Sequence, residues 1–315
     1  MKIVILDAAT LGDDIDLSLF DALGEVSVYH TTEPSLVAER VADAEVCIIN
    51  KVKLNGENLK NAKNLKLICV AATGYDNIDT EYCKQNGIAV CNVAGYSTNS
   101  VSQLTLAMVL SASVNLNAFS EAVADGSYTR GGVQNILTPV YHELAGKVWG
   151  IVGYGGIGKK VGLAAKALGC KVVVNKRTPI EDEECLSLHE LLRVSDIVTI
   201  HVPLTDKTRG MIGREELSMM KDGAFLVNVA RGAVTDEAAV AEAVLSGKLG
   251  FFGCDVYSTE PMPESHPFQK IKDCPSVCLT PHMAWGAYEA RERCMREIKE
   301  NIISFINGEM RNRIV

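Results

Sequence analysis

The sequence lacks any paired cysteine motif, although its 315 residues include 10 cysteines. No two of them stand in C-x-x-C spacing and most have apolar neighbours, so neither a zinc site nor a disulfide framework is predicted. We therefore expect reduced thiols, no bound metal and a cytoplasmic protein. The opening residues MKIVILDAAT hold too short an apolar run for a signal peptide and favour a first β-strand.

Positive charge and long apolar runs are also scarce. The 31 Lys and Arg residues are outnumbered by 39 Asp and Glu residues, and no basic stripe is present, which argues against a nucleic-acid partner. Residues 87–120 carry no charge, but Asn, Ser and Gln interrupt them. We therefore predict a helix buried between domains or subunits, and no membrane span. No internal repeat and no low-complexity tract is seen.

Short β-branched runs alternate with helical segments along almost the whole chain. This alternation predicts an α/β protein with parallel sheets covered by helices. The runs exceed what one ordinary sheet holds, so two sheets are expected, with a boundary near residues 95–103 and a last helix at about 287–307. The predicted strands are KIVIL, VCIIN, LKLICVA, IAVCN, KVWGIVG, KVVVN, IVTIHV, AFLVNV, GFFGCDV and SVCLTP.

A glycine-rich turn stands between two predicted strands. Gly153, Gly155 and Gly158 form G-x-G-x-x-G, which follows the strand 148–152 and opens a helix that ends at Gly169. Glycine allows a tight turn, a close approach of backbone N–H groups to a pyrophosphate, and close packing of helix on strand. The pattern favours a dinucleotide-binding turn. The alternative is a glycine-rich turn that binds nothing.

The end of the next strand carries positive charge. In this motif an Asp or Glu about 20 residues further on normally binds the adenosine ribose. Here Lys176 stands 18 residues after Gly158, and Arg177 follows it. Both side chains would attract a 2′-phosphate, which an acid would repel. We predict a preference for NADP(H); the alternatives are NAD(H) or dual use, with the two cations as solvated surface charges.

Polar residues follow three later strands. Arg231 comes after AFLVNV, Asp255 and Glu260 come after GFFGC, and His282 comes after SVCL. The carboxyl ends of parallel strands meet at one edge of a doubly wound sheet, so these side chains would meet at the cofactor crevice. Taken singly, each is an ordinary surface Arg, loop-capping acid or His after a proline.

With the glycine turn and these residues, the chain resembles the D-isomer-specific 2-hydroxyacid dehydrogenase family over nearly its whole length. The resemblance implies a flavodoxin-like substrate domain, residues 1–98 and 284–315, into which a Rossmann-type doubly wound cofactor domain, residues 99–283, is inserted. It places the last helix in the first domain, and it implies a homodimer with the helix from Val101 onward near the contact. The matching segments are ATGYDNID, SDIVTIHVPLTDKTRGMI, NVARGAVTDEAAV, DVYSTEP and TPHMAW.

The resemblance also implies the catalytic roles. Arg231 would pair with the substrate carboxylate and polarise the neighbouring carbonyl group. His282 would give a proton to the carbonyl oxygen during reduction and remove it during oxidation. Glu260 would hydrogen-bond to His282 and favour its charged form, so Glu260→Gln should move the pH limb of reduction downward.

The cofactor contacts follow from the glycine turn and from the resemblance. Gly156 and Ile157 would lie at the pyrophosphate, residues 201–203 along the adenosine, residues 229–231 near the nicotinamide and Asp255 at its carboxamide. The full predicted set is Gly153, Gly155, Gly156, Ile157, Gly158, Lys176, Arg177, His201, Val202, Pro203, Thr208, Val229, Ala230, Arg231, Asp255 and His282.

The substrate contacts are implied in the same way. Backbone N–H groups of Ala72, Thr73 and Gly74 would bind the substrate carboxylate, since glycine permits the required dihedral angles. The alternative is a strand-to-helix turn capped by Asp76 or Asn77. Further substrate contacts are assigned to Arg231 and Trp285. Lys51 follows the strand VCIIN and is a further candidate to face the same cleft.

The choice of substrate depends on a few residues. Glu260 argues against the formate-oxidising branch, which usually carries Gln there, whereas Trp285 and Gln103 resemble the branch that reduces hydroxypyruvate and glyoxylate. A binding pocket discriminates between two substrates that differ by one methylene group by only about 1 to 3 kcal/mol. Overlapping activity on several short 2-oxo acids is therefore expected. The alternatives are a dehydrogenase for another short 2-oxo acid and a dinucleotide-sensing, corepressor-like binding protein. Phosphoglycerate oxidation is less favoured.

Overall fold

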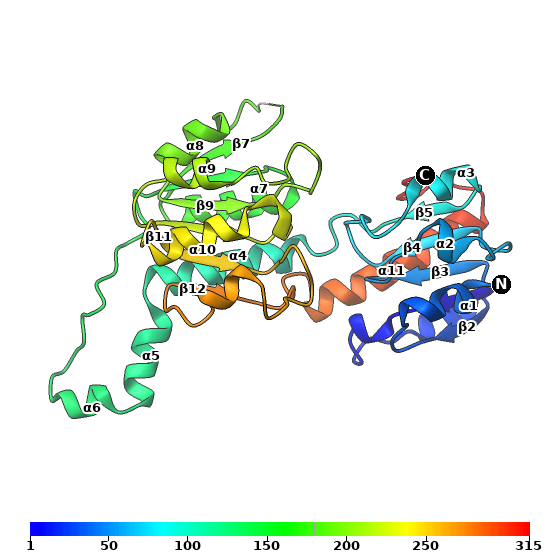
Figure 1. Cartoon of the computed structure of the whole chain (residues 1–315), viewed down its shortest axis with the longest axis horizontal. Helices are drawn as coiled ribbons and strands as arrows, with labels where there is room; N and C mark the ends of the chain where they lie inside the picture. The colour runs from blue at the N-terminus through cyan, green and yellow to red at the C-terminus, as the bar shows by residue number, and fades with distance from the viewer. Residues whose placement is uncertain (179) are drawn as a thin grey trace. The chain divides into compact units, whose positions relative to one another are not determined.

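The computed structural model describes residues 1–178 and 180–315. The chain divides into two compact units (Figure 1). Unit 1 comprises Met1–Ser97 and Gly286–Val315, and unit 2 comprises Thr98–Trp285. The sequence predicted the two boundaries between the domains after residues 98 and 283, and in the structure the boundaries between the units follow residues 97 and 285.

Unit 1 is built on a five-stranded parallel sheet in the order β2-β1-β3-β4-β5. This is the flavodoxin-like order, as predicted. Strands β3 and β4 are buried at every position, because both faces of the sheet are covered, and this explains their unbroken apolar sequences. The strands are β1 (Lys2–Ile5), β2 (Glu25–Val28), β3 (Val46–Ile49), β4 (Leu67–Val70) and β5 (Ala89–Cys91).

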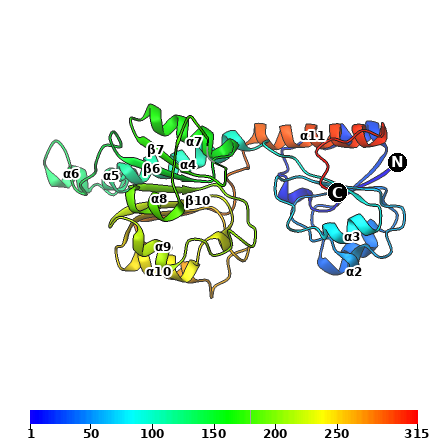
Figure 2. The same ribbon diagram turned by 90° about the horizontal axis from the view of Figure 1, so that it is seen from above.

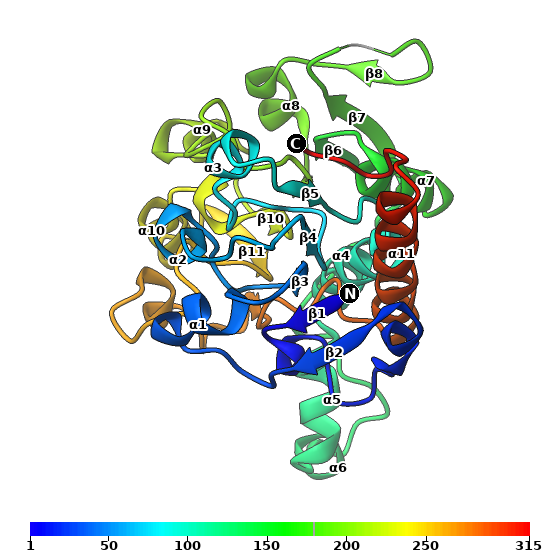
Figure 3. The same cartoon turned by 90° about the vertical axis from the view of Figure 1, so that its right-hand side faces the viewer.

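Helices cover both faces of this sheet. Figure 2 and Figure 3 show α11 along one face and α2 and α3 on the other. Helix α11 spans Tyr288–Ile306, with Ala287 and Asn307 as its caps, so the predicted last helix is confirmed and it belongs to unit 1. The other helices of unit 1 are α1 (Val37–Val41), α2 (Gly56–Leu59) and α3 (Thr80–Gln85), with 3-10 turns at Ala8–Thr10, Ser18–Leu23 and Pro34–Leu36.

Unit 2 contains a seven-stranded parallel sheet in the order β12-β11-β10-β9-β6-β7-β8. Counted from β6 as the first strand, this is the Rossmann order with one strand added at the β12 edge. The predicted α/β class and doubly wound sheet are therefore confirmed. The strands are β6 (Val148–Val152), β7 (Lys171–Asn175), β8 (Glu184–Cys185), β9 (Ile197–Ile200), β10 (Ala224–Asn228), β11 (Leu249–Cys254) and β12 (Val277–Leu279).

The helices of unit 2 also lie on two faces. Helices α4 and α7 pack together on one face, and α9 and α10 lie on the other (Figure 2). Helices α5 and α6 lead away from the sheet (Figure 1). The helices are α4 (Thr98–Ser113), α5 (Leu116–Ala124), α6 (Ser127–Gly131), α7 (Gly156–Ala167), α8 (Leu188–Val194), α9 (Arg214–Met219) and α10 (Glu237–Leu245), with 3-10 turns at Gly232–Val234 and Pro267–Lys270.

Helix α4 lies within the uncharged segment, residues 87–120. Its Met108 and Val109 are buried in an apolar cluster with Trp149 of β6, so the helix packs on the sheet of unit 2. No single helix in the described residues is long and apolar enough to cross a membrane. Helices α4 and α5 pass this test only as a pair, and the chain bends by 64° between them.

Two strands were not predicted from the sequence. Strand β2, with the sequence EVSV, is exposed at three of its four positions, and β8 has only two residues. Both lie at sheet edges, where side chains are less buried and the apolar pattern is correspondingly weak.

Candidate active site

The glycine turn after β6 leaves space for an anion. Gly153 has φ +94°, and a Cβ added to it would lie 2.7 Å from the carbonyl of His201. A Cβ on Gly158 would lie 2.2 Å from the Gly153 carbonyl oxygen, so both positions exclude a side chain. A Cβ on Gly155 would meet nothing within 4 Å, which leaves open space at the amino end of α7. Backbone N–H groups at a helix amino end bind anions, so this turn fits a pyrophosphate.

The end of β7 lies beside the glycine turn. The Gly153 N–H donates to the Asn175 carbonyl oxygen over 2.9 Å, and Lys176 follows directly. Lys176 is half-buried and Arg177 is exposed. In the described parts of the chain, neither cation has an ion-pair partner. Two uncompensated cations thus stand next to the turn that fits a pyrophosphate.

Arg231 is held by a buried amide at the end of β10. Asn228 is fully buried, and its Nδ2 donates to the Arg231 carbonyl oxygen over 2.9 Å. Its Oδ1 accepts from the Ala230 N–H over 3.0 Å. The Arg231 guanidinium donates to the Ala230 carbonyl oxygen over 2.9 Å. Asn228 therefore shapes the turn that presents Arg231, a role that the sequence analysis missed.

Glu260 and His282 are brought together although 22 positions separate them. His282 Nδ1 lies 2.6 Å from Glu260 Oε2, and their side chains are 20% and 29% exposed. The other oxygen, Oε1, accepts from the Tyr257 N–H over 3.0 Å. Because Glu260 engages Nδ1, the second ring nitrogen, Nε2, is the one available for proton transfer to a substrate.

The backbone at His282 is in the left-handed region, with φ +53°. Such a conformation costs about 1 to 3 kcal/mol and persists only where the surroundings enforce it. Asp255 enforces it: Oδ1 accepts from Thr280 Oγ1 over 2.6 Å and from the Met283 N–H over 2.9 Å, and Oδ2 accepts from the Ala284 N–H over 2.9 Å. Burial raises the pKa of Asp255, and these hydrogen bonds and His282 oppose that rise.

A comparison with protein families identifies the group to which the chain belongs. The sequence profile described as "D-isomer specific 2-hydroxyacid dehydrogenase, NAD binding domain" matches residues 106–284, more than half of the chain. The chain belongs to this family. Residues 106–284 of this D-2-hydroxyacid dehydrogenase therefore bind a nicotinamide dinucleotide.

Full-length relatives agree. The dehydrogenase is 35% identical to the glycerate dehydrogenase of Methylorubrum extorquens, over 99% of this chain and 98% of that protein. It is 35% identical to the hydroxypyruvate reductase of Blautia hydrogenotrophica, over 98% of each chain. The solved structure of the D-lactate dehydrogenase of Aquifex aeolicus, complexed with NAD and lactic acid, has a TM-score of 0.86 and 30% identity, and it covers 98% of this chain and 96% of that one.

In unit 1 of the dehydrogenase, the predicted substrate loop follows β4. The Thr73 hydroxyl donates to the Val93 carbonyl oxygen over 3.0 Å, and Asn92 Nδ2 donates to the Thr73 carbonyl oxygen over 2.7 Å. These bonds hold residues 72–74 against the end of β5. The next helix, α3, is capped by Asp79, so the alternative cap at Asp76 or Asn77 is wrong.

Two other predicted substrate contacts also have defined surroundings. Lys51 follows β3, its N–H donates to Asp7 Oδ2 over 2.6 Å, and it lines a pocket within unit 1. Trp285 is half-buried and packs on the apolar cluster that contains Val229 and Ala284. The contacts of Lys51 and Trp285 with substrate stay predictions. The contact of Asp255 with the nicotinamide carboxamide also stays a prediction. Both Asp255 oxygens already accept hydrogen bonds from the 280–284 turn.

The predicted adenosine-side loop begins at His201. Its N–H donates to the Val152 carbonyl oxygen over 2.7 Å, which places the residue beside the glycine turn. Further along, Thr208 Oγ1 donates to the Pro203 carbonyl oxygen over 2.7 Å and folds the loop back. Both ring nitrogens of His201 are shielded and have no hydrogen-bond partner among the described residues. Burial lowers the pKa of His201 to about 3, so the ring is neutral at neutral pH.

This shift predicts acid sensitivity. In the unfolded chain His201 has its ordinary pKa of 6.5, so below that pH the unfolded state binds a proton that the folded state does not take up. Stability from this residue is complete above pH 6.5 and falls by up to about 1.4 kcal/mol per pH unit as the pH drops toward 3. His201→Gln should lose less free energy of unfolding than the unsubstituted protein between pH 7 and pH 5, as measured by denaturant titration. The exposed residue His142, changed to Gln, is the control. An unaltered pH dependence in His201→Gln would contradict the assignment.

Proposed function

We propose that this protein reduces a small 2-oxo acid, hydroxypyruvate or glyoxylate, to the D-2-hydroxy acid with NAD(P)H, in a reversible reaction. The observation that carries this proposal is the 2.6 Å contact between His282 Nδ1 and Glu260 Oε2 at the ends of the sheet strands. The names of the two relatives support the substrate, because glycerate and hydroxypyruvate are the two ends of one such reaction.

The chain's own residues would bind the substrate and move its proton. Arg231 would pair with the substrate carboxylate, as a guanidinium binds it through two hydrogen bonds, and would polarise the neighbouring carbonyl. Backbone N–H groups of residues 72–74 would bind the same carboxylate. When bound, the nicotinamide supplies the hydride, and His282 Nε2 gives its proton to the carbonyl oxygen. Glu260 stabilises the imidazolium that must be present for this transfer.

The cofactor would be held by unit 2, and unit 1 would be the substrate domain. The turn from Gly153 to Gly158 would hold the pyrophosphate, and Lys176 and Arg177 would bind the 2′-phosphate of NADP(H), which we propose as the preferred cofactor over NAD(H). Residues 201–203, Thr208, residues 229–231 and Asp255 would complete its contacts. The 10 free cysteines support a reducing, cytoplasmic compartment.

A matrix of two cofactors and several acids tests the proposal. NADH and NADPH are each combined with glyoxylate, hydroxypyruvate, pyruvate and bulkier 2-oxo acids, and kcat/KM is followed at the nicotinamide absorbance. The highest values are expected with hydroxypyruvate or glyoxylate. A bulkier acid as best substrate would favour another dehydrogenase of the family, and no turnover on any acid would favour the dinucleotide-sensing binding protein.

We further propose that the protein forms a homodimer through unit 2, as the family resemblance implies. The segment after α4 exposes apolar side chains, among them Leu116 (55%), Leu137 (71%) and Val140 (71%). Exposed apolar side chains that gather on one segment favour a protein partner. Together with α4, this segment would form the contact.

The dimer has a direct test. Leu137→Asp combined with Val140→Asp should raise the dimer dissociation constant by at least about a hundredfold, because each apolar side chain contributes about 1.5 to 3 kcal/mol when buried. Light scattering after size-exclusion chromatography would then show a monomer. Val28→Asp, at an exposed apolar position in unit 1, should stay dimeric. A monomer before any substitution would contradict the proposal.

A further inference from the structure

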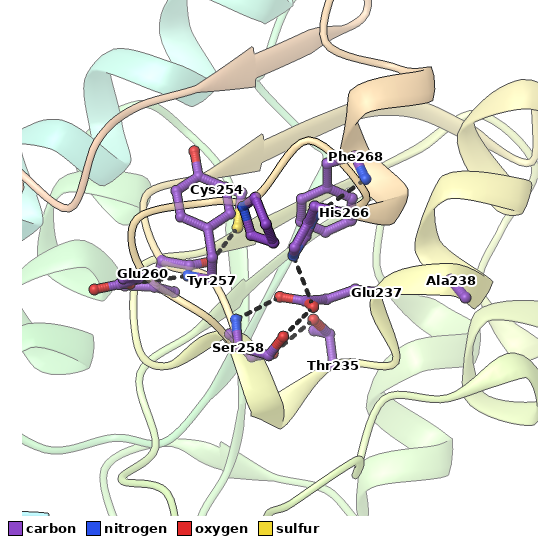
Figure 4. Close-up of polar contacts among 12 residues, drawn as sticks. Thr235, Glu237, Ala238, Cys254, Tyr257, Ser258, Glu260, His266 and Phe268 are labelled. Carbon is purple, nitrogen blue, oxygen red and sulfur yellow. Dashed lines mark hydrogen bonds and ion pairs between the residues drawn. The ribbon is translucent and has the colours of Figure 1, made fainter.

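A buried carboxylate lies outside the catalytic residues described above. Glu237 is the first residue of α10, and Asp236 already caps that helix. The Glu237 side chain is not needed as a cap, and it is buried, with 9% of it exposed. Its Oε1 accepts from the Ser258 N–H over 2.7 Å, and its Oε2 accepts from the Ser258 hydroxyl over 2.5 Å (Figure 4).

His266 closes the other side of this carboxylate. Its side chain is 3% exposed, and Nε2 lies 2.9 Å from Glu237 Oε2. Nδ1 accepts from the Phe268 N–H over 3.1 Å, so Nδ1 carries no proton and the proton of the neutral ring is on Nε2. Nε2 is close to Glu237 but makes no hydrogen bond among the described residues. The ring also packs edge to face on Phe268 and Tyr257, with centroids 4.9 and 5.8 Å away. The imidazole is thus held by the hydrogen bond at Nδ1 and by its ring contacts with Phe268 and Tyr257.

Ser258 connects this cluster to the Glu260 and His282 pair. It lies between Tyr257, whose N–H donates to Glu260 Oε1, and Glu260 itself. The Tyr257 hydroxyl donates to the Thr280 carbonyl oxygen over 2.9 Å, two positions before His282. The segment that carries Glu260 is therefore tied to Glu237 on one side and to the His282 turn on the other.

The same segment also supports the Arg231 turn. A Cβ added to Gly232 would lie 2.1 Å from the Tyr257 carbonyl carbon and 2.2 Å from the Ser258 nitrogen. The backbone next to Arg231 therefore packs directly on residues 257 and 258. A shift of Ser258 would move both Arg231 and Glu260.

We propose that Glu237, Ser258 and His266 are positioning residues, which set the Glu260 carboxylate against His282 and fix the turn of Arg231. This inference rests on the proposed function only for its kinetic consequences. Hydrogen bonds to a buried carboxylate are directional, and an unpaired buried partner is costly, so the cluster defines one place for the Ser258 backbone. A misplacement of about 1 Å can cost about a hundredfold in rate, which gives such a cluster a measurable effect.

The experiment uses variants of each member in the full chain. Ser258→Ala and His266→Leu change no charge, His266→Gln restores an N–H donor, and Glu237→Gln keeps the shape of the side chain. Asp196→Asn is the matched control, because its carboxylate also accepts a backbone N–H, from Val148 over 2.8 Å, and a lysine, Lys221 over 2.9 Å. Asp196 lies at the opposite, amino ends of the strands. Glu260→Gln serves as the reference for a lost His282 partner.

Three readouts separate positioning from general support. We expect Glu237→Gln and His266→Leu to lower kcat at least about tenfold and to leave KM for the cofactor within about twofold. The basic limb of the pH–rate profile for reduction should move to lower pH, as it should in Glu260→Gln. This shift is expected even in the variants that change no charge. His266→Gln should recover part of the lost kcat. Asp196→Asn should lower Tm comparably with neither kinetic change.

Different results would contradict the positioning role of these residues and the proposed function of the protein. The titration midpoint of the His282 ring, followed by NMR without substrate or cofactor, should move to lower pH in His266→Leu and Ser258→Ala. A lowered Tm with an unmoved midpoint and an unmoved kcat would overturn the positioning role, even where the enzyme is active. A moved midpoint in a protein that reduces no 2-oxo acid would support the positioning role and reject the proposed function. If His266→Leu does not fold, Ser258→Ala decides the matter.

Discussion

Replacing His282 by Gln is expected to lower kcat for 2-oxo acid reduction by about 10² to 10⁴, because the developing alkoxide loses its proton donor. The structure places Nδ1 against Glu260, so proton transfer depends on the single nitrogen Nε2. Gln has no group that is acidic at neutral pH and cannot replace it. KM should change far less than kcat, since Arg231, the proposed partner of the substrate carboxylate, is retained.

Steady-state rates at the nicotinamide absorbance, with hydroxypyruvate and glyoxylate, measure this effect. His142→Gln, which alters an exposed histidine of the same unit, should keep the full rate. A His282→Gln variant with a rate within about threefold of the unsubstituted protein would remove His282 from acid–base catalysis. A selective loss of cofactor affinity would instead make it a binding residue.

The second large effect concerns the choice of cofactor. Removing one cation that binds the 2′-phosphate should lower kcat/KM with NADPH about ten- to hundredfold, since a charge-assisted hydrogen bond contributes about 1.5 to 3 kcal/mol. The value with NADH should change little in Lys176→Ala and Arg177→Ala. Lys176→Asp should go further and favour NADH, because an acid accepts hydrogen bonds from the ribose hydroxyls and repels a phosphate.

The matched control is Lys171→Ala at the other end of β7. Lys171 is also exposed, and it pairs with Glu184 over 3.0 Å. Because Lys171 is a cation as well, its replacement by Ala changes the net charge of the protein by the same amount. It should leave the ratio of NADPH to NADH efficiency unchanged. Equal efficiency with both cofactors before any substitution would show that Lys176 and Arg177 do not bind a 2′-phosphate. The single variants also show which of the two cations makes the contact.

Most of the fold was predictable because the signals for it are local. Buried parallel strands require unbroken apolar runs such as VCII and LICV, and the glycine turn requires glycine at Gly153 and Gly158 for steric reasons. The edge strands β2 and β8 escaped, since an edge strand needs less burial and leaves a weaker pattern. The cap at Asp79 was misplaced because several polar residues in that turn were equally suited to cap the helix.

The sequence by itself determined the α/β class, the dinucleotide turn and the identity of Arg231, Glu260 and His282 as candidates, because residues after parallel strands share one edge of a sheet. Only the tertiary structure decided how they are held. Asn228 shapes the Arg231 turn, Asp255 enforces the left-handed backbone at His282, and Glu237 with His266 supports the segment of Glu260. These contacts join residues that are distant in sequence or lie in tight turns. Such bonds depend on atomic packing, which leaves no periodic pattern in the sequence.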